Sequence, residues 1–299
     1  MTAPASMAAT WSIAVFAHNE APRIAATLRS IEAAAHGMAV EVVVLANGCQ
    51  DGTAQVVRDL AAASPHLRVV EIALADKAHA WNEYVHAVAA TATLHVFVDG
   101  DVQLAPGALQ ALARRLEQVP AAHAVGGLPT TGRDREGWSQ RMLSQGTLAG
   151  GLYALRGSFV QTLRQRGIRL PQGLVGEDWL VSLWAGRDLQ PTAMALDASG
   201  YVVFAPEAGF AFRSLSPWRL RDYRTYARRL WRYAQRGVQY EMVWQWLRLR
   251  LPESLPPDVR TLYAQAPTPS RLLWTGSVLG SLLRCLAVHQ VRRVHRGQG

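Results

Sequence analysis

The strongest constraint on the fold is the regular alternation of short apolar segments with longer amphipathic segments between residues 11 and 101. The apolar segments are predicted strands at Ser12–Phe16, Glu41–Leu45, Leu67–Ile72 and Leu94–Val98. The segments between them have helical periodicity, at Ala21–Ala35, Gly52–Ala63 and Ala78–Thr91. Strands that alternate with helices form βαβ units with parallel strands. The sequence therefore predicts an α/β fold with a mostly parallel central sheet flanked by helices.

The rest of the chain is less regular. A helix through Glu117, a strand at 124–127 and a polar loop at 129–137 are expected after Pro106. From residue 206 onward, Trp, Tyr and Leu alternate with Arg at helical spacing, which is typical of amphipathic helices with a cationic side. The last of these helices is expected at 271–296. We therefore divide the chain into a flexible N-terminus (1–10), an α/β domain (11–205) and a basic, Trp/Arg-rich helical region (206–299).

Charge is distributed unevenly between these parts. Residues 1–205 contain 15 Lys and Arg against 17 Asp and Glu, whereas residues 206–299 contain 16 against 5. The two parts thus carry −2 and +11 of the net charge of +9. A basic region of this kind can bind an anionic membrane surface, cover the α/β domain or bind nucleic acid. Trp and Arg together favour anionic headgroups, and since no nucleic-acid motif accompanies the charge, we expect no nucleic-acid partner.

The cellular location can also be predicted. The only two cysteines, Cys49 and Cys285, lie far apart without metal-ligand spacing, so they indicate neither a disulfide framework nor a zinc site. The residues before Trp11 lack the pattern of a secretion signal, and no apolar run reaches the roughly 18 residues of a membrane span. We expect a cytoplasmic protein, peripheral on the inner face of the membrane.

The motif Asp99-Gly100-Asp101 follows directly after the predicted strand that ends at Val98. Open α/β sheets bind ligands at the carboxyl ends of their strands, and carboxylate oxygens suit Mg²⁺ or Mn²⁺. An Asp-Gly pair can also be a simple turn. Its position at a strand end nevertheless predicts a site for a divalent metal and phosphate.

Polar residues also follow the other three strands of this half. They are His18-Asn19-Glu20 after the first, the loop Ala46–Thr53 with Asn47 after the second, and Asp76-Lys77 after the third. A glycine-containing loop before a helix offers backbone N–H groups to a phosphate, and a lysine adds a cation. Helix capping by Asn19 and a solvated Lys77 are the simpler explanations. The four strand ends together predict the floor of one ligand pocket.

In this order, the motifs resemble the GT-A domain of family 2 glycosyltransferases. The family's Tyr-Asn-Glu appears as His18-Asn19-Glu20, its acidic loop as Ala46–Thr53, its metal motif as Asp99-Gly100-Asp101 and its Glu-Asp acceptor motif within Gly176–Leu180. The resemblance covers Trp11–Trp184 and extends weakly to Gly237. Ala46 and Asn47 replace two carboxylates that help hold the nucleoside in the family, so the nucleotide base stays open.

The resemblance implies a Rossmann-like GT-A fold for residues 11–205 and an inverting, metal-dependent transfer of a sugar from a nucleoside-diphosphate sugar to an acceptor hydroxyl, with a lipid-linked acceptor among the candidates. It implies Asp101 as the principal ligand of Mg²⁺ or Mn²⁺ and Asp99 as a metal or nucleotide contact. Asp178 is the expected base, and Glu177 orients the acceptor or neighbouring basic residues. The expected nucleotide-sugar contacts are His18, Asn19, Glu20, Asn47, Lys77, Asp99 and Gly100, with Arg228 and Arg229 from a loose likeness to the family's Gln-x-x-Arg-Trp motif.

Two other functions are compatible with parts of the pattern. A nucleotidyltransferase shares the acidic metal site, but it is expected to have a basic glycine-rich N-terminal loop, which His18-Asn19-Glu20 is not. A non-catalytic nucleotide-sugar binding protein would explain Ala46 and Asn47. The presence of Asp99, Asp101 and Asp178 favours an enzyme.

Overall fold

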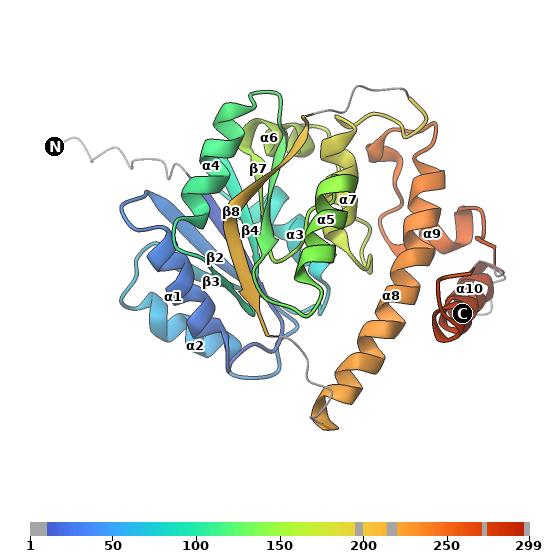
Figure 1. Ribbon diagram of the computed structural model, residues 1–299, viewed down its shortest axis with the longest axis horizontal. Helices are drawn as coiled ribbons and strands as arrows, with labels where there is room; N and C mark the ends of the chain where they lie inside the picture. The colour runs from blue at the N-terminus through green and yellow to red at the C-terminus, as the bar shows by residue number, and fades with distance from the viewer. Residues whose placement is uncertain (1–10, 195–199, 214–219, 271–273, 296–299) are drawn as a thin grey trace.

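The computed structural model describes residues 11–194, 200–213, 220–270 and 274–295, so the N-terminus 1–10 that we expect to be flexible lies outside the described residues. Its centre is a sheet with the strand order β3-β2-β1-β4-β7-β6-β8-β5 (Figure 1). The strands are β1 (Trp11–Ala17), β2 (Val40–Asn47), β3 (Leu67–Ile72), β4 (Leu94–Asp99), β5 (Val102–Leu104), β6 (Ala124–Pro129), β7 (Leu152–Arg156) and β8 (Val202–Phe212). The helices are α1 (Ile24–Ala34), α2 (Thr53–Ala61), α3 (Lys77–Glu83), η1 (Tyr84–Val88), α4 (Ala108–Gln118), α5 (Arg135–Gln145), α6 (Gly157–Gln165), α7 (Glu177–Gly186), α8 (Leu220–Trp246), η2 (Pro252–Ser254), α9 (Val259–Gln265) and α10 (Val278–His295).

The first four strands form the parallel half of the sheet. β1 pairs in parallel with β2 and β4, and β2 pairs in parallel with β3. Each of these strands contains one of the four predicted segments, and a helix follows each of β1, β2 and β3. The predicted α/β class with a mostly parallel sheet is confirmed.

The second half of the sheet is mixed. β7 is antiparallel to β4 and β6, whereas β6 and β8 are parallel and β5 is antiparallel to β8. β8 contains Pro206 within a register shift, where Gly126 faces Phe204 and Leu128 faces Gly209. Proline lacks an N–H group and is tolerated at such irregularities. The sheet therefore continues past residue 205, where the sequence placed the start of the basic region.

Two further segments differ from the sequence-based expectation. The single helix predicted for 78–91 is α3 followed by the π-helical η1, in which the Ala89 N–H donates to the carbonyl of Tyr84 at 2.9 Å. Within the polar segment 129–137, α5 already begins at Arg135. Trp138 packs edge-on against Phe210 and Phe212, which fixes this helix to β8.

The sheet has a different hydrophobic core on each face. Ile13 and Val15 of β1 pack with α1 and α4, whereas Ala14 and Phe16 pack with α3 and α6. This alternation follows from the two-residue period of a strand. On the α3 side, Phe97 lies at the centre of an aromatic cluster that includes Trp81, Tyr84 and Tyr153, with ring centroids 5.9, 5.5 and 4.7 Å away.

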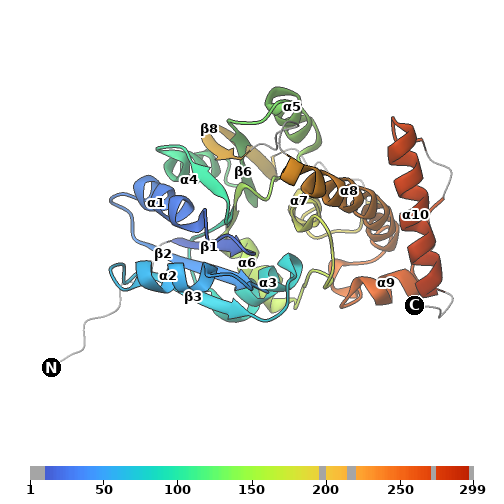
Figure 2. The same cartoon turned by 90° about the horizontal axis from the view of Figure 1, so that it is seen from below.

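The C-terminal helices extend the core on that same side. α8 lies beside the α/β unit and α10 lies on its far side (Figures 1 and 2). Val238, Met242 and Val243 of α8 are buried in the α3-side core, to which Val288 of α10 also belongs. Among the described helices, none has both the length and the hydropathy that a membrane crossing requires. The C-terminal region thus packs on the α/β unit as a helical layer.

A buried histidine makes the stability of this core dependent on pH. His95 of β4 is 1% exposed, and its Nδ1 lies 3.1 Å from the hydroxyl of Tyr84. Burial, helped by Arg164, lowers the pKa of His95 from 6.5 to about 4. The unfolded chain therefore binds the additional proton first, and stability is lost as the pH falls from 6.5 towards 4.

We predict that His95→Asn removes a stability loss of at most about 3 kcal/mol between pH 6.5 and 4. Urea unfolding at several pH values measures this loss as the difference between the wild type and the variant. His66→Asn, at an exposed position, is the matched control and should retain the wild-type pH dependence. An unchanged pH dependence in His95→Asn would contradict the prediction.

Candidate functional site

The predicted strand-end residues meet at one edge of the sheet. Phe16 is paired with Asp99 and Ala17 with Ala46, so His18, Asn47 and the Asp99-Gly100-Asp101 turn share the carboxyl edge. The Gly100 N–H donates to the carbonyl of Phe16 at 2.8 Å, and a Cβ at Gly100 would lie 2.9 Å from that oxygen. Glycine is therefore required for this turn to pack against β1.

Lys77 connects three elements at this edge. It is the first residue of α3, whose N-cap Asp76 accepts a hydrogen bond from the His79 N–H at 3.0 Å. Its Nζ pairs with Asp99 at the end of β4 and, at 2.6 Å, with Glu177 at the start of α7. Although burial alone would lower it, these carboxylates hold the pKa of Lys77 well above its usual value. Lys77 is therefore a charged ammonium between two carboxylates.

Asp178, the expected base, has partners other than those of Glu177. Its Oδ2 accepts a hydrogen bond from the Gly150 N–H at 3.0 Å, and its Oδ1 accepts from the Trp179 N–H at 2.9 Å. The Arg236 guanidinium pairs with Oδ1 at 3.2 Å. Burial and the neighbouring Glu177 raise the pKa of Asp178, and Arg236 opposes that shift.

Arg236 is held in place by other residues of α8 and α7. Its Nε donates to the Tyr240 hydroxyl, which in turn donates to the carbonyl of Gly176 at 3.3 Å. The ring of Tyr240 stacks on Trp179 with centroids 3.9 Å apart. The backbone of Gly176 has φ = 87°, and a side chain there would collide with Arg236 and Tyr240. The glycine before α7 thus allows Arg236 and Tyr240 of α8 to pack against the start of that helix.

Gly150 contacts both Lys77 with Asp99 and the carboxylate of Asp178. A Cβ at this position would be 2.8 Å from Nζ of Lys77 and 3.3 Å from Oδ2 of Asp99. The Gly150 N–H is already bonded to Asp178. Glycine at position 150 therefore lets the backbone lie close to the charged cluster, and a side chain there would displace the Lys77 ammonium.

Asp99 and Asp101 fit a divalent cation. Asp101 is half-buried in the turn after β4. Burial, with the like charges of Glu177 and Asp101, raises the pKa of Asp99 to about 6 in spite of Lys77. A cation would relieve this repulsion. Mg²⁺ and Mn²⁺ suit one or two carboxylates completed by phosphate oxygens. Within the described ranges, no three His, Cys, Asp or Glu side chains converge as a cage, so the donor set would depend on a phosphate ligand.

The loops after β1 and β2 are bound tightly to each other. His18 donates from Nδ1 to the carbonyl of Asn47 at 2.7 Å, and Asn19, with φ = 56°, accepts from the Gln50 N–H at 2.8 Å. Glu20 pairs with Arg23 at 2.6 Å. Burial and the nearby charge of Asp101 raise the pKa of Glu20, and Arg23 opposes that shift. His18 and Asn19 are exposed at the edge, where a ligand can reach them.

Asn47 is buried, and its amide donates to the carbonyl of Ala17 at 3.0 Å. An ionised carboxylate could not make that bond, because it has no hydrogen to donate. The substitution noted in the sequence therefore fits a structural use of this side chain.

The arginine that reaches the acidic cluster differs from the two that the sequence indicated. Arg228 is exposed and Arg229 half-buried on α8, and their contact with a diphosphate stays a prediction. Arg236 pairs with Asp178. It lies seven residues after Arg229, on the same side of a helix. Helical periodicity was the one signal that could have suggested it.

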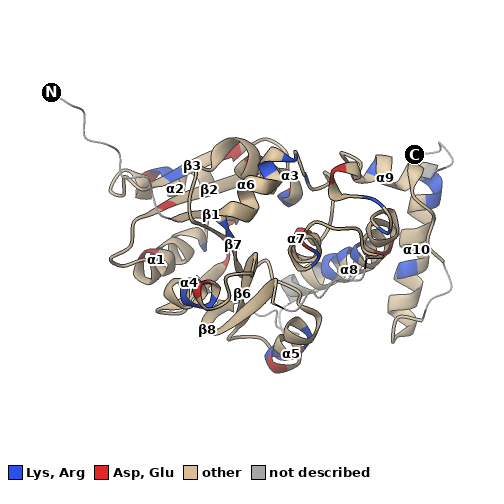
Figure 3. Cartoon of the chain, turned by 90° about the horizontal axis from the view of Figure 1, so that it is seen from above, with Lys and Arg blue, Asp and Glu red and all other residues tan. Residues whose placement is uncertain are grey.

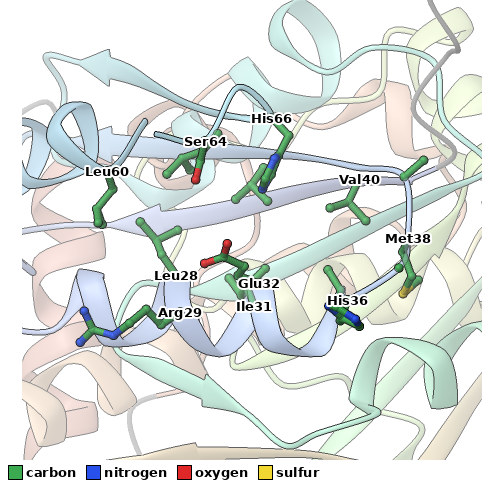
Figure 4. A pocket seen from close by; sticks show the side chains of 15 residues that line it. Leu28, Arg29, Ile31, Glu32, His36, Met38, Val40, Leu60, Ser64 and His66 are labelled. Atoms are coloured by element: carbon green, nitrogen blue, oxygen red, sulfur yellow. The ribbon is translucent and has the colours of Figure 1, made fainter. Parts of the chain in front are cut away.

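A separate cavity of about 420 Å³ lies at the opposite edge of the sheet. Its lining comes from α1, the turn before β2, and the segment before β3 (Figure 4). Glu32, His36 and His66 are at its rim, and Leu28, Ile31 and Val40 contribute apolar surface. These are the amino ends of β2 and β3, so the cavity is remote from the charged cluster.

The chain is similar to known proteins in sequence and in fold. Residues 12–171 match Glycosyl transferase family 2. No curated protein shows significant sequence similarity to the chain. Among solved structures, the mannosyltransferase PcManGT from Pyrobaculum calidifontis, in complex with GDP-Man and Mn²⁺, is 21% identical with a TM-score of 0.61 over 97% of this chain and 76% of that one.

Two other solved structures are similar. Glucosyl-3-phosphoglycerate synthase from Mycobacterium tuberculosis, in complex with Mn²⁺, UDP-glucose and phosphoglyceric acid, is 20% identical with a TM-score of 0.51 over 83% of this chain and 80% of that one. Residues 1–349 of S. aureus TarS are 14% identical with a TM-score of 0.50 over 96% and 90%. At these identities the likeness concerns the fold, and it confirms the predicted GT-A type.

The position of Lys77 between two carboxylates predicts a stability effect. Lys77→Met leaves Asp99 and Glu177 without their shared cation and should cost about 2 kcal/mol of unfolding free energy, given partial exposure of the site. Lys77→Met with Glu177→Gln should regain part of that loss, because one of the two unpaired carboxylates is removed. Urea unfolding at pH 7.5 measures both.

The control for this cycle is Arg58→Met, which breaks the exposed ion pair with Glu71 and should cost less than about 1 kcal/mol. Equal losses for Lys77→Met and Arg58→Met would show that Lys77 does not hold the cluster together.

Proposed function

The chain belongs to glycosyl transferase family 2, and from this premise we propose that it transfers a sugar from a nucleoside-diphosphate sugar to an acceptor hydroxyl, with metal assistance and inversion at the anomeric carbon. The observation that carries the proposal is the cluster at the carboxyl edge. There, Lys77 and Asp99 lie beside Gly150. Asp178, which is paired with Arg236, accepts a hydrogen bond from the Gly150 N–H.

The donor side consists of the end of β4 and the start of α3. Asp101 and Asp99 would hold Mg²⁺ or Mn²⁺, which when bound offsets the charge that develops on the departing diphosphate. Lys77 supplies a fixed positive charge beside the same position. His18 and Asn19, which are exposed after β1, would contact the nucleoside together with the half-buried Glu20. The absence of a side chain at Gly150 lets Lys77 and Asp99 lie close to its backbone on this side.

The acceptor side consists of Asp178 and its partners. The acceptor oxygen attacks the anomeric carbon and forms the new C–O bond, while its proton passes to a carboxylate oxygen of Asp178. The bond between that carbon and the diphosphate oxygen breaks, and the diphosphate leaves with the electron pair. One direct displacement from the opposite face inverts the anomeric centre.

The environment of Asp178 suits a base. Burial and Glu177 raise the pKa of its carboxyl, which strengthens it as a proton acceptor, while Arg236 opposes that rise. The bonds from Gly150 and Arg236 also fix its orientation. Glu177 neutralises Lys77 and so holds that cation near the donor.

We also propose that the enzyme works at the cytoplasmic face of an anionic membrane, where a lipid-linked acceptor would present its hydroxyl. The support for this is the charge of +11 in residues 206–299, together with the Arg and Trp content of that region.

The donor and the metal can be tested together by thermal unfolding. At a concentration of about 100 Kd, the correct nucleoside-diphosphate sugar should raise the Tm by roughly 5 °C in the presence of Mn²⁺. Asp101→Asn should abolish the metal-dependent part of the shift, whereas Asp59→Asn, at an exposed position on α2, should leave it intact. A panel of UDP-, GDP- and dTDP-sugars without any shift would contradict the proposal.

The roles of Asp178 and Arg236 predict distinct kinetic changes. Asp178→Asn should lower kcat by about 10²- to 10⁴-fold, because the proton has no acceptor. Arg236→Met removes a positive charge that lowers the pKa of Asp178, so the pH below which kcat falls should move up by about one unit. Arg236→Lys should restore most of this shift.

Arg232→Met, at an exposed position of the same helix, is the control and should retain the wild-type profile. A lower kcat in Arg236→Met with an unmoved pH profile would assign Arg236 a structural role only.

A further inference from the structure

α10 has two apolar faces, one of which packs against the rest of the protein. Ala287, Val288 and Val291 are buried in the core shared with α8 and α9. Arg284, on this inner side, is 5% exposed and pairs with Glu241 of α8 at 2.6 Å. These contacts fix the rotation of α10 about its axis.

The opposite face of α10 is apolar but exposed. Val278, Leu279, Leu282 and Leu286 are 78%, 53%, 56% and 50% exposed. At about 100° per residue, they project opposite to the buried residues of the inner face. We call these four residues the outer stripe of α10. A surface helix normally presents polar groups to water, and a contiguous apolar patch is typical of an interaction site.

The charge around the outer stripe is of one sign. Residues 271–299 contain five arginines and no Asp or Glu. Arg293 of α10 is exposed and Arg292 is half-buried. Figure 3 shows positive but no negative residues along the described part of this helix. Trp274, just before the helix, is 67% exposed, and tryptophan is enriched at the boundary between membrane and water.

We propose that α10 lies in the surface of a membrane that contains anionic lipids, with its outer stripe among the acyl chains and its arginines at the phosphates. This inference rests on the membrane association proposed above and names the element that produces it. An amphipathic helix with an apolar face and a basic rim binds membranes in this orientation. A second copy of the chain is a less favourable partner for the outer stripe. A symmetric contact would bring two cationic helices together, and they would repel each other.

Docking through α10 would connect the membrane to the acceptor side of the site. α10 packs on α8 through the ion pair of Arg284 with Glu241. α8 also carries Arg236, which binds Asp178. α8, whose Arg236 pairs with the proposed base Asp178, is therefore also the helix on which α10 packs.

Sedimentation of the full chain with vesicles tests the proposal. We expect binding to vesicles of 30% phosphatidylglycerol in phosphatidylcholine, weaker binding at higher salt, and little binding to pure phosphatidylcholine. Leu282→Ser with Leu286→Ser should weaken binding at least tenfold. Leu143→Ser, at a position on α5 that is 49% exposed, is the matched control and should bind as the wild type does.

Three results would overturn the proposal: equal binding to neutral and anionic vesicles, unchanged binding of the double variant, or a dimer in sedimentation velocity that the double variant dissociates.

The double variant should keep the donor-dependent thermal shift, which shows that it is folded. Asp101→Asn should lose the metal-dependent part of that shift but still bind vesicles. Failure at the membrane and failure of the proposed activity are therefore distinguishable.

Discussion

The ion pairs of Lys77 with Asp99 and Glu177 hold together the elements that form the proposed active site. They join the start of α3, the end of β4 and the start of α7 at one point of the carboxyl edge. Asp178 follows Glu177 directly, so the position of Lys77 also determines where Asp178 can meet Gly150 and Arg236. Several like charges are confined to a small, largely buried space, which raises the pKa of Asp99 and Asp178. Such perturbed groups are typical of functional sites.

The C-terminal region is part of this arrangement. The family match ends at residue 171, yet Arg236 and Tyr240 of α8 complete the surroundings of Asp178. The match also decides between the reaction classes compatible with the acidic motif, in favour of glycosyl transfer over nucleotidyl transfer. On the proposed assignment of Asp178 as the base, the helices after the sheet therefore contribute to the acceptor side of the GT-A fold.

Much of the fold and part of the site follow from local sequence. The four parallel strands and the Asp99-Gly100-Asp101 turn were predictable, because strand periodicity and a glycine between carboxylates are local signals. The π-helical η1 and the continuation of β8 through Pro206 depend on packing and on a register shift, which no short segment encodes. Arg236 could not be singled out among the α8 arginines. Its partner Asp178 lies 58 residues earlier in the chain, so their contact depends on how α8 packs against α7.

The position of the metal and the donor can be checked by a crystal structure with Mn²⁺ and the nucleoside diphosphate of the preferred donor. We expect the anomalous signal of Mn²⁺ at Asp101, within ligand distance of the diphosphate, with the nucleoside over the loops after β1 and β2. Gly150 and Asp178 should then face the sugar of the donor. A diphosphate bound at another edge of the sheet, or Mn²⁺ held without Asp99 or Asp101, would show that the carboxyl-edge cluster is not the donor site.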